Sequence, residues 1–241
     1  MTALIKVIIT SLLSLFFFSC NFDGVFNQLD GKGEIITQEH EIEAFNQITV
    51  EKGWDVVLIK SDQPKLVVKA NENLLENLKF SVSNQLLSIS SKKNIGRADA
   101  KIIQVYYTDE LQKIASQSGA EITSNEVLKQ DKLQIDASSG SEIELQLQTQ
   151  RTEAKSSSGA DMELTGSSDN FEAKASSGSE IDTQNLITKS ASASASSGSE
   201  ITLSVSENFT AKTSSGGEIN YYGNPKSTSL NNSISGSIHK K

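Results

Sequence analysis

Small or apolar residues alternate with polar residues between Leu133 and Tyr221, in five successive segments that align on a Ser-Gly pair. The small or apolar positions lie seven, five and three residues before each glycine, and three and five residues after it. In order along the chain they are Leu133, Ile135, Ala137, Ile143, Leu145, Thr152, Ala154, Ser156, Met162, Leu164, Phe171, Ala173, Ala175, Ile181, Thr183, Ala191, Ala193, Ala195, Ile201, Leu203, Phe209, Ala211, Thr213, Ile219 and Tyr221. A period of two is typical of β-strands. Each segment therefore predicts two short strands and two bends in about twenty residues.

The segments recur with a nearly constant period. Their glycines, together with an earlier and a later copy, are Gly119, Gly140, Gly159, Gly178, Gly198, Gly216 and Gly236, separated by 21, 19, 19, 20, 18 and 20 residues. A unit this short cannot bury an apolar face alone, so it must stack on its neighbours. The sequence predicts an all-β, parallel β-solenoid with about 18–21 residues per coil, right-handed because parallel crossovers nearly always are.

The residues expected inside the coils are small, which fits the narrow interior of such a fold. The serines that precede the glycines are expected to form a buried column of stacked hydroxyls; they are Ser139, Ser158, Ser177, Ser197 and Ser215. The alternative is disorder, because residues 190–198 are low in complexity when taken alone. A regular apolar residue three positions after every glycine favours the folded interpretation.

The preceding part of the chain, residues 31–110, has larger apolar residues and less regular coils. Its strand-like runs are Glu34–Thr37, Phe45–Val50, Trp54–Ile59, Leu66–Ala70, Leu78–Val82, Leu86–Ser90 and Ile102–Tyr107. Residues 72–78 predict one helical turn, capped by Asn71 or Asn73. No linker rich in proline or glycine interrupts this part, so we expect a wider portion of the same sheet in a single domain over residues 31–241, with residues 111–236 as the regular repeats.

The motifs of both parts together resemble a known family. Gly31–Thr37, Phe45–Val50, Ala70–Leu75 and the Ser-Gly-Ser-Glu-Ile array are similar to the "putative auto-transporter adhesin, head GIN domain" family of Bacteroidetes-type bacteria, over Gly31 to about Gly236. The resemblance implies an extracytoplasmic β-helical domain, often on a lipoprotein, with an adhesin label that is itself inferred. It implies no catalytic residues.

The N-terminus predicts an export signal. Lys6 precedes an apolar run from Val7 to Phe18, which is too short to span a bilayer but matches a signal peptide. The run ends at Ser19-Cys20, and Cys20 is the only cysteine of the chain. This ending resembles a bacterial lipobox, which implies cleavage before Cys20 and lipidation of that residue; the alternative is a plain signal with a chance cysteine. Residues 1–19 are thus the predicted lipoprotein signal peptide and residues 20–30 a tether.

Charge limits the class of partner. The chain has a formal net charge of −8, and removal of Met1–Ser19 with Lys6 makes it −9. An acidic protein without clustered cations is a poor binder of nucleic acid. We expect a protein of the cell envelope, most simply at the outer membrane, attached through its lipid and contacting a glycan or protein partner at the cell surface.

The clearest chemical pattern is an acid two residues after each repeat glycine: Glu121, Glu142, Asp161, Glu180, Glu200 and Glu218. In a solenoid these acids form one outward row, in which neighbouring charges repel by about 1 kcal/mol in water. Lysines four residues before the glycines, Lys155, Lys174 and Lys212, are expected to offset that repulsion. A calcium ladder is one interpretation of the row, and a solvated face without a metal is the simpler one.

Other functions have less support in the sequence. His40 and His239 lie near opposite ends of the chain, and the regular acid row does not resemble the grooves of sugar-cleaving β-helices. We therefore expect a non-catalytic adhesin or scaffold with no cofactor. A carbohydrate-active β-helix enzyme and a glycan-binding module remain the alternatives, with Trp54, Tyr106, Tyr107, Tyr221 and Tyr222 as candidates for stacking on sugars. Residues 224–241 predict a capping coil, because an open stack would expose strand edges.

Overall fold

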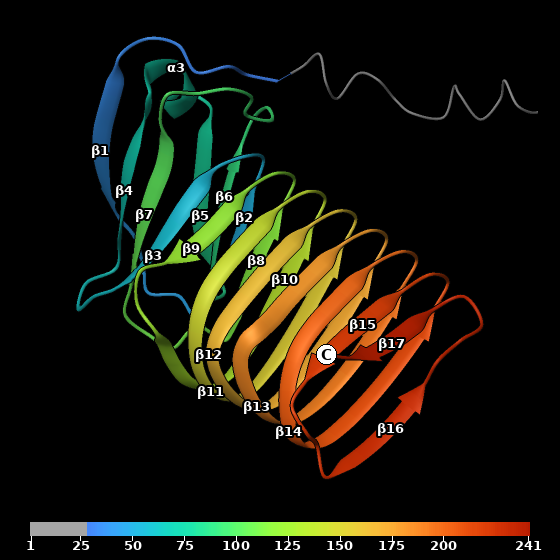
Figure 1. The fold of residues 1–241 in the computed structure, drawn as a ribbon. Coiled ribbons are helices and arrows are strands. Elements are labelled where there is room, and N and C mark those ends of the chain that lie inside the picture. Colours follow the sequence, from blue (N-terminus) through green and yellow to red (C-terminus); the bar gives the residue numbers. More distant parts are fainter. Residues whose placement is uncertain (1–27) are drawn as a thin grey trace, which may run out of the picture.

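Curved β-strands stacked side by side make up most of the molecule (Figure 1), as the computed structural model of residues 28–241 shows. About two thirds of the chain is strand, and the stacked strands form a β-solenoid of about seven turns. All seventeen strands belong to one sheet. Among residues 28–241, no helix is long and apolar enough to cross a membrane.

The regular repeats form the centre of the stack. Their strands are β8 (Lys113–Gln117), β9 (Glu121–Ser124), β10 (Leu128–Ser138), β11 (Glu142–Ser157), β12 (Asp161–Ser176), β13 (Glu180–Ser196), β14 (Glu200–Ser214) and β15 (Glu218–Tyr222). Successive strands pair in parallel, so that equivalent residues of neighbouring repeats lie side by side: Ile143 pairs with Met162, and Met162 with Ile181. The predicted parallel β-solenoid is confirmed.

The interior contains the residues that the alternation places there. All twenty-five inward positions of the five aligned segments are buried, from fully apolar Ile143 and Ile201 to hydroxyl-bearing Thr152 and Thr183. Three buried hydroxyls, those of Thr149, Thr152 and Ser168, hydrogen-bond to one another inside the coil at 2.7–3.2 Å. Polar groups that lie inside the solenoid are thus satisfied within it, as burial requires.

The prediction of two short strands per repeat is wrong in one respect. Strands β11 to β14 each run for 15–17 residues from one Ser-Gly turn to the next, and they curve through the second bend without ending. Near this bend the pairing register shifts, between Glu163 and Gly166 in β12 and between Thr183 and Ile187 in β13. Gly166 has a φ of +99°, and a Cβ there would collide with the carbonyl oxygen of Leu147 in the preceding coil.

The serines before the glycines are not a buried column, which corrects the second expectation. Ser139, Ser158, Ser177, Ser197 and Ser215 are exposed and have φ between +50° and +58°, followed by a glycine that is also at positive φ. The pair therefore forms the tip of the coil. Its hydrogen bonds are made by the backbone: the Gly159 N–H donates to the carbonyl of Ser177 at 3.2 Å, and equivalent bonds join the other tips.

Buried serines lie one residue after the glycine instead. Ser141, Ser179 and Ser199 are 1–2 % exposed, and the hydroxyl oxygen of each accepts a hydrogen bond from the backbone N–H three residues earlier in the same turn. The Ser141 hydroxyl also donates to the carbonyl of Ser116 in the preceding coil at 2.8 Å. These serines satisfy turn amides that would otherwise lack a partner.

All seven strands expected between residues 31 and 110 are present. They are β1 (Ile35–Glu41), β2 (Gln47–Glu51), β3 (Asp55–Lys60), β4 (Lys65–Asn71), β5 (Leu78–Ser83), β6 (Leu86–Ser91) and β7 (Lys101–Tyr107). Strands β2 and β3 extend the parallel stack by pairing with β8 and β9. Their other edges pair in parallel with β6 and β7, and antiparallel strands β5, β4 and β1 follow further out. This end of the solenoid is therefore built from antiparallel pairs, which the sequence did not indicate.

The predicted helical turn is α3 (Glu72–Leu75). Asn71 occupies its N-cap position, but the side chain makes no capping hydrogen bond. Its Oδ1 instead accepts from the backbone N–H groups of Asp99 and Ala100, at 3.1 and 3.2 Å, and its Nδ2 donates to the carbonyl of Gly33. Asn71 thus ties the segment before β7 to the start of β1.

The last coil consists of β16 (Ser227–Asn231), which pairs with β14, and β17 (Ser237–Lys240), which pairs with β15. The coil expected from residues 224–241 is therefore present at the end of the stack. Its side chains are mostly exposed, including Leu230 and Ile234. We expect this coil to prevent association of the stack end to end.

Candidate functional site

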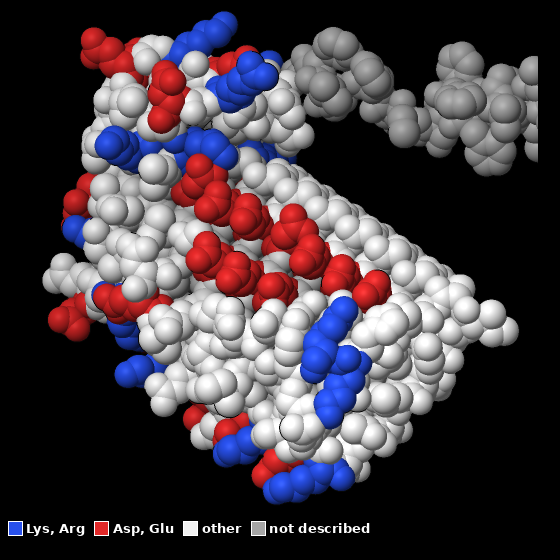
Figure 2. All heavy atoms as spheres, viewed as in Figure 1, with Lys and Arg blue, Asp and Glu red and all other residues white. Residues whose placement is uncertain are grey.

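Ten acidic side chains occupy one face of the solenoid in two adjacent columns, which we call the acidic face (Figure 2). The first column follows the Ser-Gly turns, and register pairs connect all its members; they are Asp55, Glu121, Glu142, Asp161, Glu180, Glu200 and Glu218. The second column lies two residues further along the strands and contains Glu144, Glu163 and Asp182. The predicted row is confirmed, and it is longer and wider than expected.

The second column and Asp55 are absent from the row that the sequence predicts. The same alternation contained the signal, because residues four positions after a glycine point outward just as those two positions after it do. Asp55 follows Gly53 as Glu121 follows Gly119, but it lies before the inserted strands β4 to β7 and outside the regular period.

Crowding on the acidic face affects protonation. Burial raises the pKa of Glu121 above its ordinary value, and the neighbouring carboxylates of Asp55 and Glu142 raise it further. Burial likewise raises the pKa of Glu180, followed by the charges of Glu200 and Asp161. Both groups therefore bind protons more tightly in the folded chain than in the unfolded chain.

The lysines four residues before the glycines do not offset this crowding, contrary to expectation. Lys155, Lys174 and Lys212 precede the turns, on strand segments that stack in register with β8 and β16. The acids follow the turns, on segments that stack with β9 and β15. Lys174 pairs with Glu172 at 2.6 Å. Within residues 28–241, the only ion pair that involves the acidic face joins Asp55 to Lys101 at 2.6 Å.

No metal centre is preformed on the acidic face from acids and histidines alone. In the part of the chain that the structure describes, no group of three or more His, Cys, Asp or Glu side chains is arranged to hold a metal ion. Side chains of one column project in parallel at the spacing of neighbouring strands, about 4.8 Å. Their carboxylate oxygens therefore do not point toward a common centre where a metal ion could bind.

We expect Glu180→Gln to stabilise the protein at neutral pH. Because the folded-state pKa of Glu180 is raised, its ionisation costs stability as the pH rises above about 4.5, the ordinary value for a glutamate. The substitution should raise the free energy of unfolding at pH 7 by a few tenths of a kcal/mol, the scale of an exposed like-charge pair. The gain should disappear below pH 4.5 in urea denaturation experiments.

Glu172→Gln provides the matched control with the opposite sign. The hydrogen bond from Lys174 lowers the pKa of Glu172, with further contributions from the charges of Lys174 and Arg151. Its carboxylate therefore stabilises the folded protein at neutral pH, and that contribution is lost as the pH falls through the folded-state pKa. Two shifts of the same sign at pH 7 would contradict this account of the two faces.

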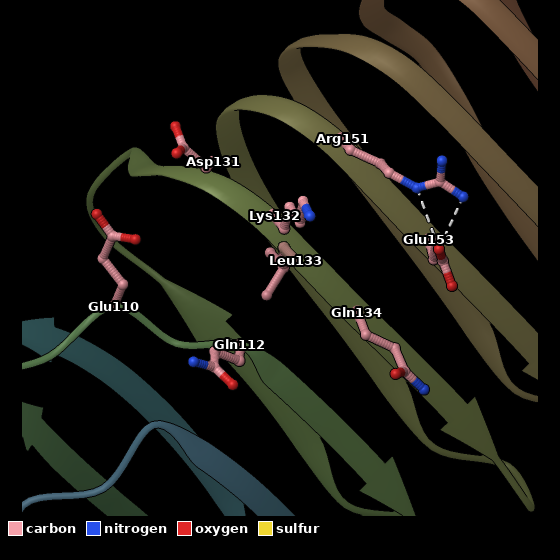
Figure 3. Close-up of a pocket in the computed structure, with 8 residues that line it drawn as sticks. All are labelled: Glu110, Gln112, Asp131, Lys132, Leu133, Gln134, Arg151 and Glu153. Carbon is pink, nitrogen blue, oxygen red and sulfur yellow. Dashed lines mark hydrogen bonds and ion pairs between the residues drawn. The ribbon is translucent and has the colours of Figure 1, made fainter.

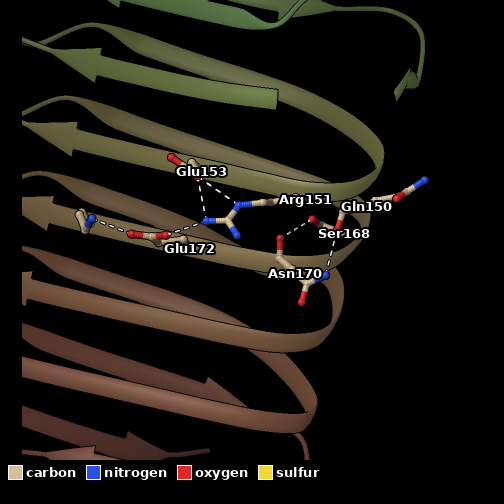
Figure 4. A network of polar contacts seen from close by, with 7 residues as sticks. Gln150, Arg151, Glu153, Ser168, Asn170 and Glu172 are labelled. Atoms are coloured by element: carbon tan, nitrogen blue, oxygen red, sulfur yellow. Dashed lines mark hydrogen bonds and ion pairs between the residues drawn. The ribbon is translucent and has the colours of Figure 1, made fainter. Parts of the chain in front are cut away.

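The opposite face carries a paired network in place of uncompensated charge (Figure 4). The guanidinium of Arg151 donates to Glu153 at 2.9 Å and to Glu172 of the next coil at 3.3 Å, and Glu172 also pairs with Lys174. Beside it, Asn170 donates to the carbonyl of Gln150 at 3.3 Å. Charges on this face alternate along each strand, while register partners in neighbouring coils carry the same charge, as Glu153 and Glu172 do. The ion pairs therefore join positions two residues apart, within one strand or diagonally between two coils.

An open depression lies next to this network (Figure 3). It has a volume of about 790 Å³ and is lined by Glu110, Gln112, Asp131, Lys132, Leu133, Gln134, Arg151 and Glu153. A second depression of about 260 Å³ begins on the other side of Arg151 and runs over Ser190, Ser192 and Asn208. Amide and charged groups line the first depression, and hydroxyl, amide and charged groups line the second, so both present hydrogen-bonding groups to solvent.

The aromatic residues singled out in the sequence do not form a stacking platform. Trp54 is fully buried and donates its Nε1–H to the carbonyl of Ser90 at 3.1 Å, and Tyr107 and Tyr221 are also buried. Only Tyr106 and Tyr222 are partly exposed, as expected for one member of each adjacent pair.

His40 in β1 and His239 in β17 lie at opposite ends of the stack. Cys20, the predicted lipidation site, lies outside the described residues.

Comparison with protein families identifies the fold. The model of the family described as "Putative auto-transporter adhesin, head GIN domain" matches residues 44–225, which is more than half of the chain. The chain belongs to this head GIN family. Curated proteins of established function give no match.

Solved structures share the head GIN architecture. A protein of Bacteroides fragilis described as a putative adhesin is 21 % identical, with a TM-score of 0.81 over 88 % of this chain and 100 % of that one. A putative adhesin of Parabacteroides distasonis is 17 % identical, with a TM-score of 0.71 over 89 % and 100 % of the two chains. A protein of the same species described as a putative lipid binding protein is 21 % identical, with a TM-score of 0.67 over 89 % and 99 %. At these identities the likeness shows the fold alone.

Proposed function

We propose that the chain is a non-catalytic lipoprotein of the cell envelope, anchored through Cys20 and most simply placed at the outer membrane, whose solenoid serves as an adhesin or scaffold. The observation that carries this proposal is the contrast between a filled interior and two broad, repetitive outer faces. The interior positions of the repeats are occupied by small and apolar side chains, and the outer faces repeat the same groups from coil to coil. Repetition of this kind suits many weak contacts along an extended partner.

The opposite face favours a glycan over a flat protein surface as that partner. The smaller depression is lined by serine, asparagine and threonine side chains, and the larger one by glutamine and charged side chains. Arg151 borders both and is held in place by two carboxylates. Such groups form hydrogen bonds to sugar hydroxyls without requiring charge on the sugar. The alternative of a carbohydrate-active enzyme needs a free acid and base at one cleft. Glu153 and Glu172 are both engaged by Arg151. Glu110 and Asp131 line the larger depression outside any ion pair of the described residues, so an assay for new reducing ends is the test of this alternative.

The anchor is tested by Cys20→Ala. The wild-type protein should sediment with membranes, and the variant should be recovered almost entirely in the soluble extracytoplasmic fraction, because the thiol that would carry the lipid is missing. Cell fractionation followed by immunoblotting measures the ratio. Ser19→Ala, which keeps a small residue before the cysteine, is the control and should remain in the membrane. Retention of the Cys20→Ala protein in the membrane pellet would refute the anchor.

Two further measurements distinguish the possible roles. Protease treatment of intact cells should degrade the solenoid if it acts as an adhesin, whereas protection would place it in the periplasm and favour the scaffold. Incubation with bacterial and host glycans, with assay for new reducing ends, separates the enzyme from the glycan-binding module. Binding on a glycan array without release of reducing ends is the result we expect.

A further inference from the structure

A third depression lies on the face that carries the Arg151 network, and it crosses four successive coils. It has a volume of about 490 Å³. Two rows of side chains line it, and each row takes one residue from each of β10, β11, β12 and β13, paired in register. The first row contains Asp136, Lys155, Lys174 and Ser194, and the second contains Ser138, Ser157, Ser176 and Ser196. We call this site the lysine–serine shelf.

The hydroxyls of the second row are free to bind a ligand. All four serines are partly exposed, and within residues 28–241 none of their hydroxyls takes part in a hydrogen bond. Each hydroxyl can both donate and accept, and register partners lie about 4.8 Å apart along the stack. The shelf therefore offers a ligand one unoccupied hydroxyl at every coil.

The lysines of the shelf supply positive charge that the protein only partly neutralises. Lys174 pairs with Glu172 at 2.6 Å. Lys155 lies in no ion pair of the described residues. Lys212 of β14 continues the row beside Ser194 and is also outside any ion pair there. A ligand that lies along the shelf thus meets exposed ammonium groups from three coils.

The negative charges of the molecule do not cancel this row. Asp136, the one acid of the shelf, pairs with Lys113 at 2.9 Å. The acidic face lies on the segments after the turns, so the buried interior separates it from the shelf. Packed sheets lie about 10 Å apart, and charges are screened over about 8 Å at physiological ionic strength. An anionic ligand on the shelf is therefore little affected by the acidic face.

We propose that the lysine–serine shelf binds a linear acidic polysaccharide whose chain runs along the axis of the stack. This inference rests on the proposed function and specifies the glycan. One ring of an extended polysaccharide is nearly as long as the spacing between coils, so successive sugars meet successive serines. Uronate carboxylates along one edge of the chain accept charge-assisted hydrogen bonds from Lys155, Lys174 and Lys212. A neutral polysaccharide gains only the contacts to the serines.

Titration calorimetry of the full chain with polygalacturonate and with its methyl ester tests the class of ligand. The two polymers share a backbone and differ in carboxylate charge. We expect polygalacturonate to bind at least tenfold more tightly at low salt, and the difference to shrink at high salt because screening weakens exposed charge pairs. Oligomers that cross all four coils should bind, whereas galacturonic acid alone should give no measurable heat, because its contacts are confined to one coil.

Lys155→Gln combined with Lys212→Gln tests the site. It removes two exposed charges, so we expect the circular dichroism spectrum to be unchanged. Binding of polygalacturonate should weaken at least tenfold, and binding of the ester should not change. Lys189→Gln combined with Lys226→Gln is the matched control, because it removes the same charge from exposed lysines that pair with Asp169 and Glu207 outside the shelf. It should change the Kd less than twofold.

Poly-L-glutamate separates recognition of a sugar from attraction to any polyanion. It carries carboxylates on a chain without hydroxyl groups, and it should bind at least tenfold more weakly than polygalacturonate. Equal binding of these two polyanions, or equal weakening by the two double variants, would overturn the inference. Equal binding of polygalacturonate and its ester would also overturn it but would leave the proposed glycan binding intact. Absence of any binding to polygalacturonate overturns it as well, and the glycan array then decides whether the chain binds glycans at all.

Discussion

Replacement of Gly166 by alanine is expected to lower the free energy of unfolding by about 4 kcal/mol, from backbone strain and overpacking together. Gly166 lies in the bend of β12 at a φ of +99°, where an L-residue is strained. An added Cβ would also meet the carbonyl oxygen of Leu147, in the coil against which β12 is packed. The clash is with backbone that is held in the β-ladder, so the neighbouring coil cannot move aside without breaking its own hydrogen bonds.

Gly159→Ala separates strain from space. Gly159 also has a positive φ, +67°, but nothing lies within 4 Å of the position that its Cβ would occupy. This variant should lose only about 1 kcal/mol, the usual cost of alanine in the left-handed region. Urea unfolding followed by far-UV circular dichroism measures both. If the two variants lost equal stability, the close approach of Leu147 would not be what requires glycine in the bend.

Deletion of residues 227–241 is expected to produce a protein that dimerises or aggregates and that unfolds at a lower temperature. The deletion removes β16 and β17, and with them the hydrogen-bond partners of the outer edges of β14 and β15. Unpaired edges of this length pair with another chain. It also uncovers apolar side chains of the last complete coil, including Phe209 and Ile219, which are buried in the full chain.

The control for this deletion is the double substitution Leu230→Ser and Ile234→Ser. It removes the two exposed apolar side chains of the last coil and keeps its strands. We expect it to be monomeric by light scattering, with a thermal midpoint close to that of the wild type. A deletion variant that stayed monomeric with an unchanged midpoint would show that residues 227–241 are only a tail.

The inside of the repeats could be predicted from the sequence because side-chain direction in a strand depends only on parity. Ala154 and Ile143 differ in size, but both lie at odd distances from the nearest Ser-Gly pair, and the structure buries both. The same parity says nothing of strand direction. The runs at Leu66–Ala70 and Leu86–Ser90 alternate as any half-buried strand does, so the antiparallel pairing of β4 and the β5–β6 hairpin could not be foreseen.

The turns and the charge pattern were harder to predict for a related reason. A turn with two consecutive residues at positive φ usually has asparagine or aspartate before its glycine. Here serine takes that position, as at Ser139 and Ser158, so the sequence did not indicate that the Ser-Gly pair forms the turn. Once the serine is at the tip, residues before and after it lie on opposite faces. Lys174 therefore pairs with Glu172 and does not lie on the acidic face.

The in-register stacking of whole strands has a mechanical consequence. Hydrogen bonds between coils point along the axis of the stack, and the interface between β11 and β12 contains fifteen register pairs. A pull along that axis would load all of them at once, so the interface would resist as a unit. The outermost interface has shorter strands, with five pairs between β14 and β16 and four between β15 and β17. Under such a load the terminal coil should separate first. A partner bound to the sides of the long strands would therefore withstand a greater force than a partner bound to the terminal coil.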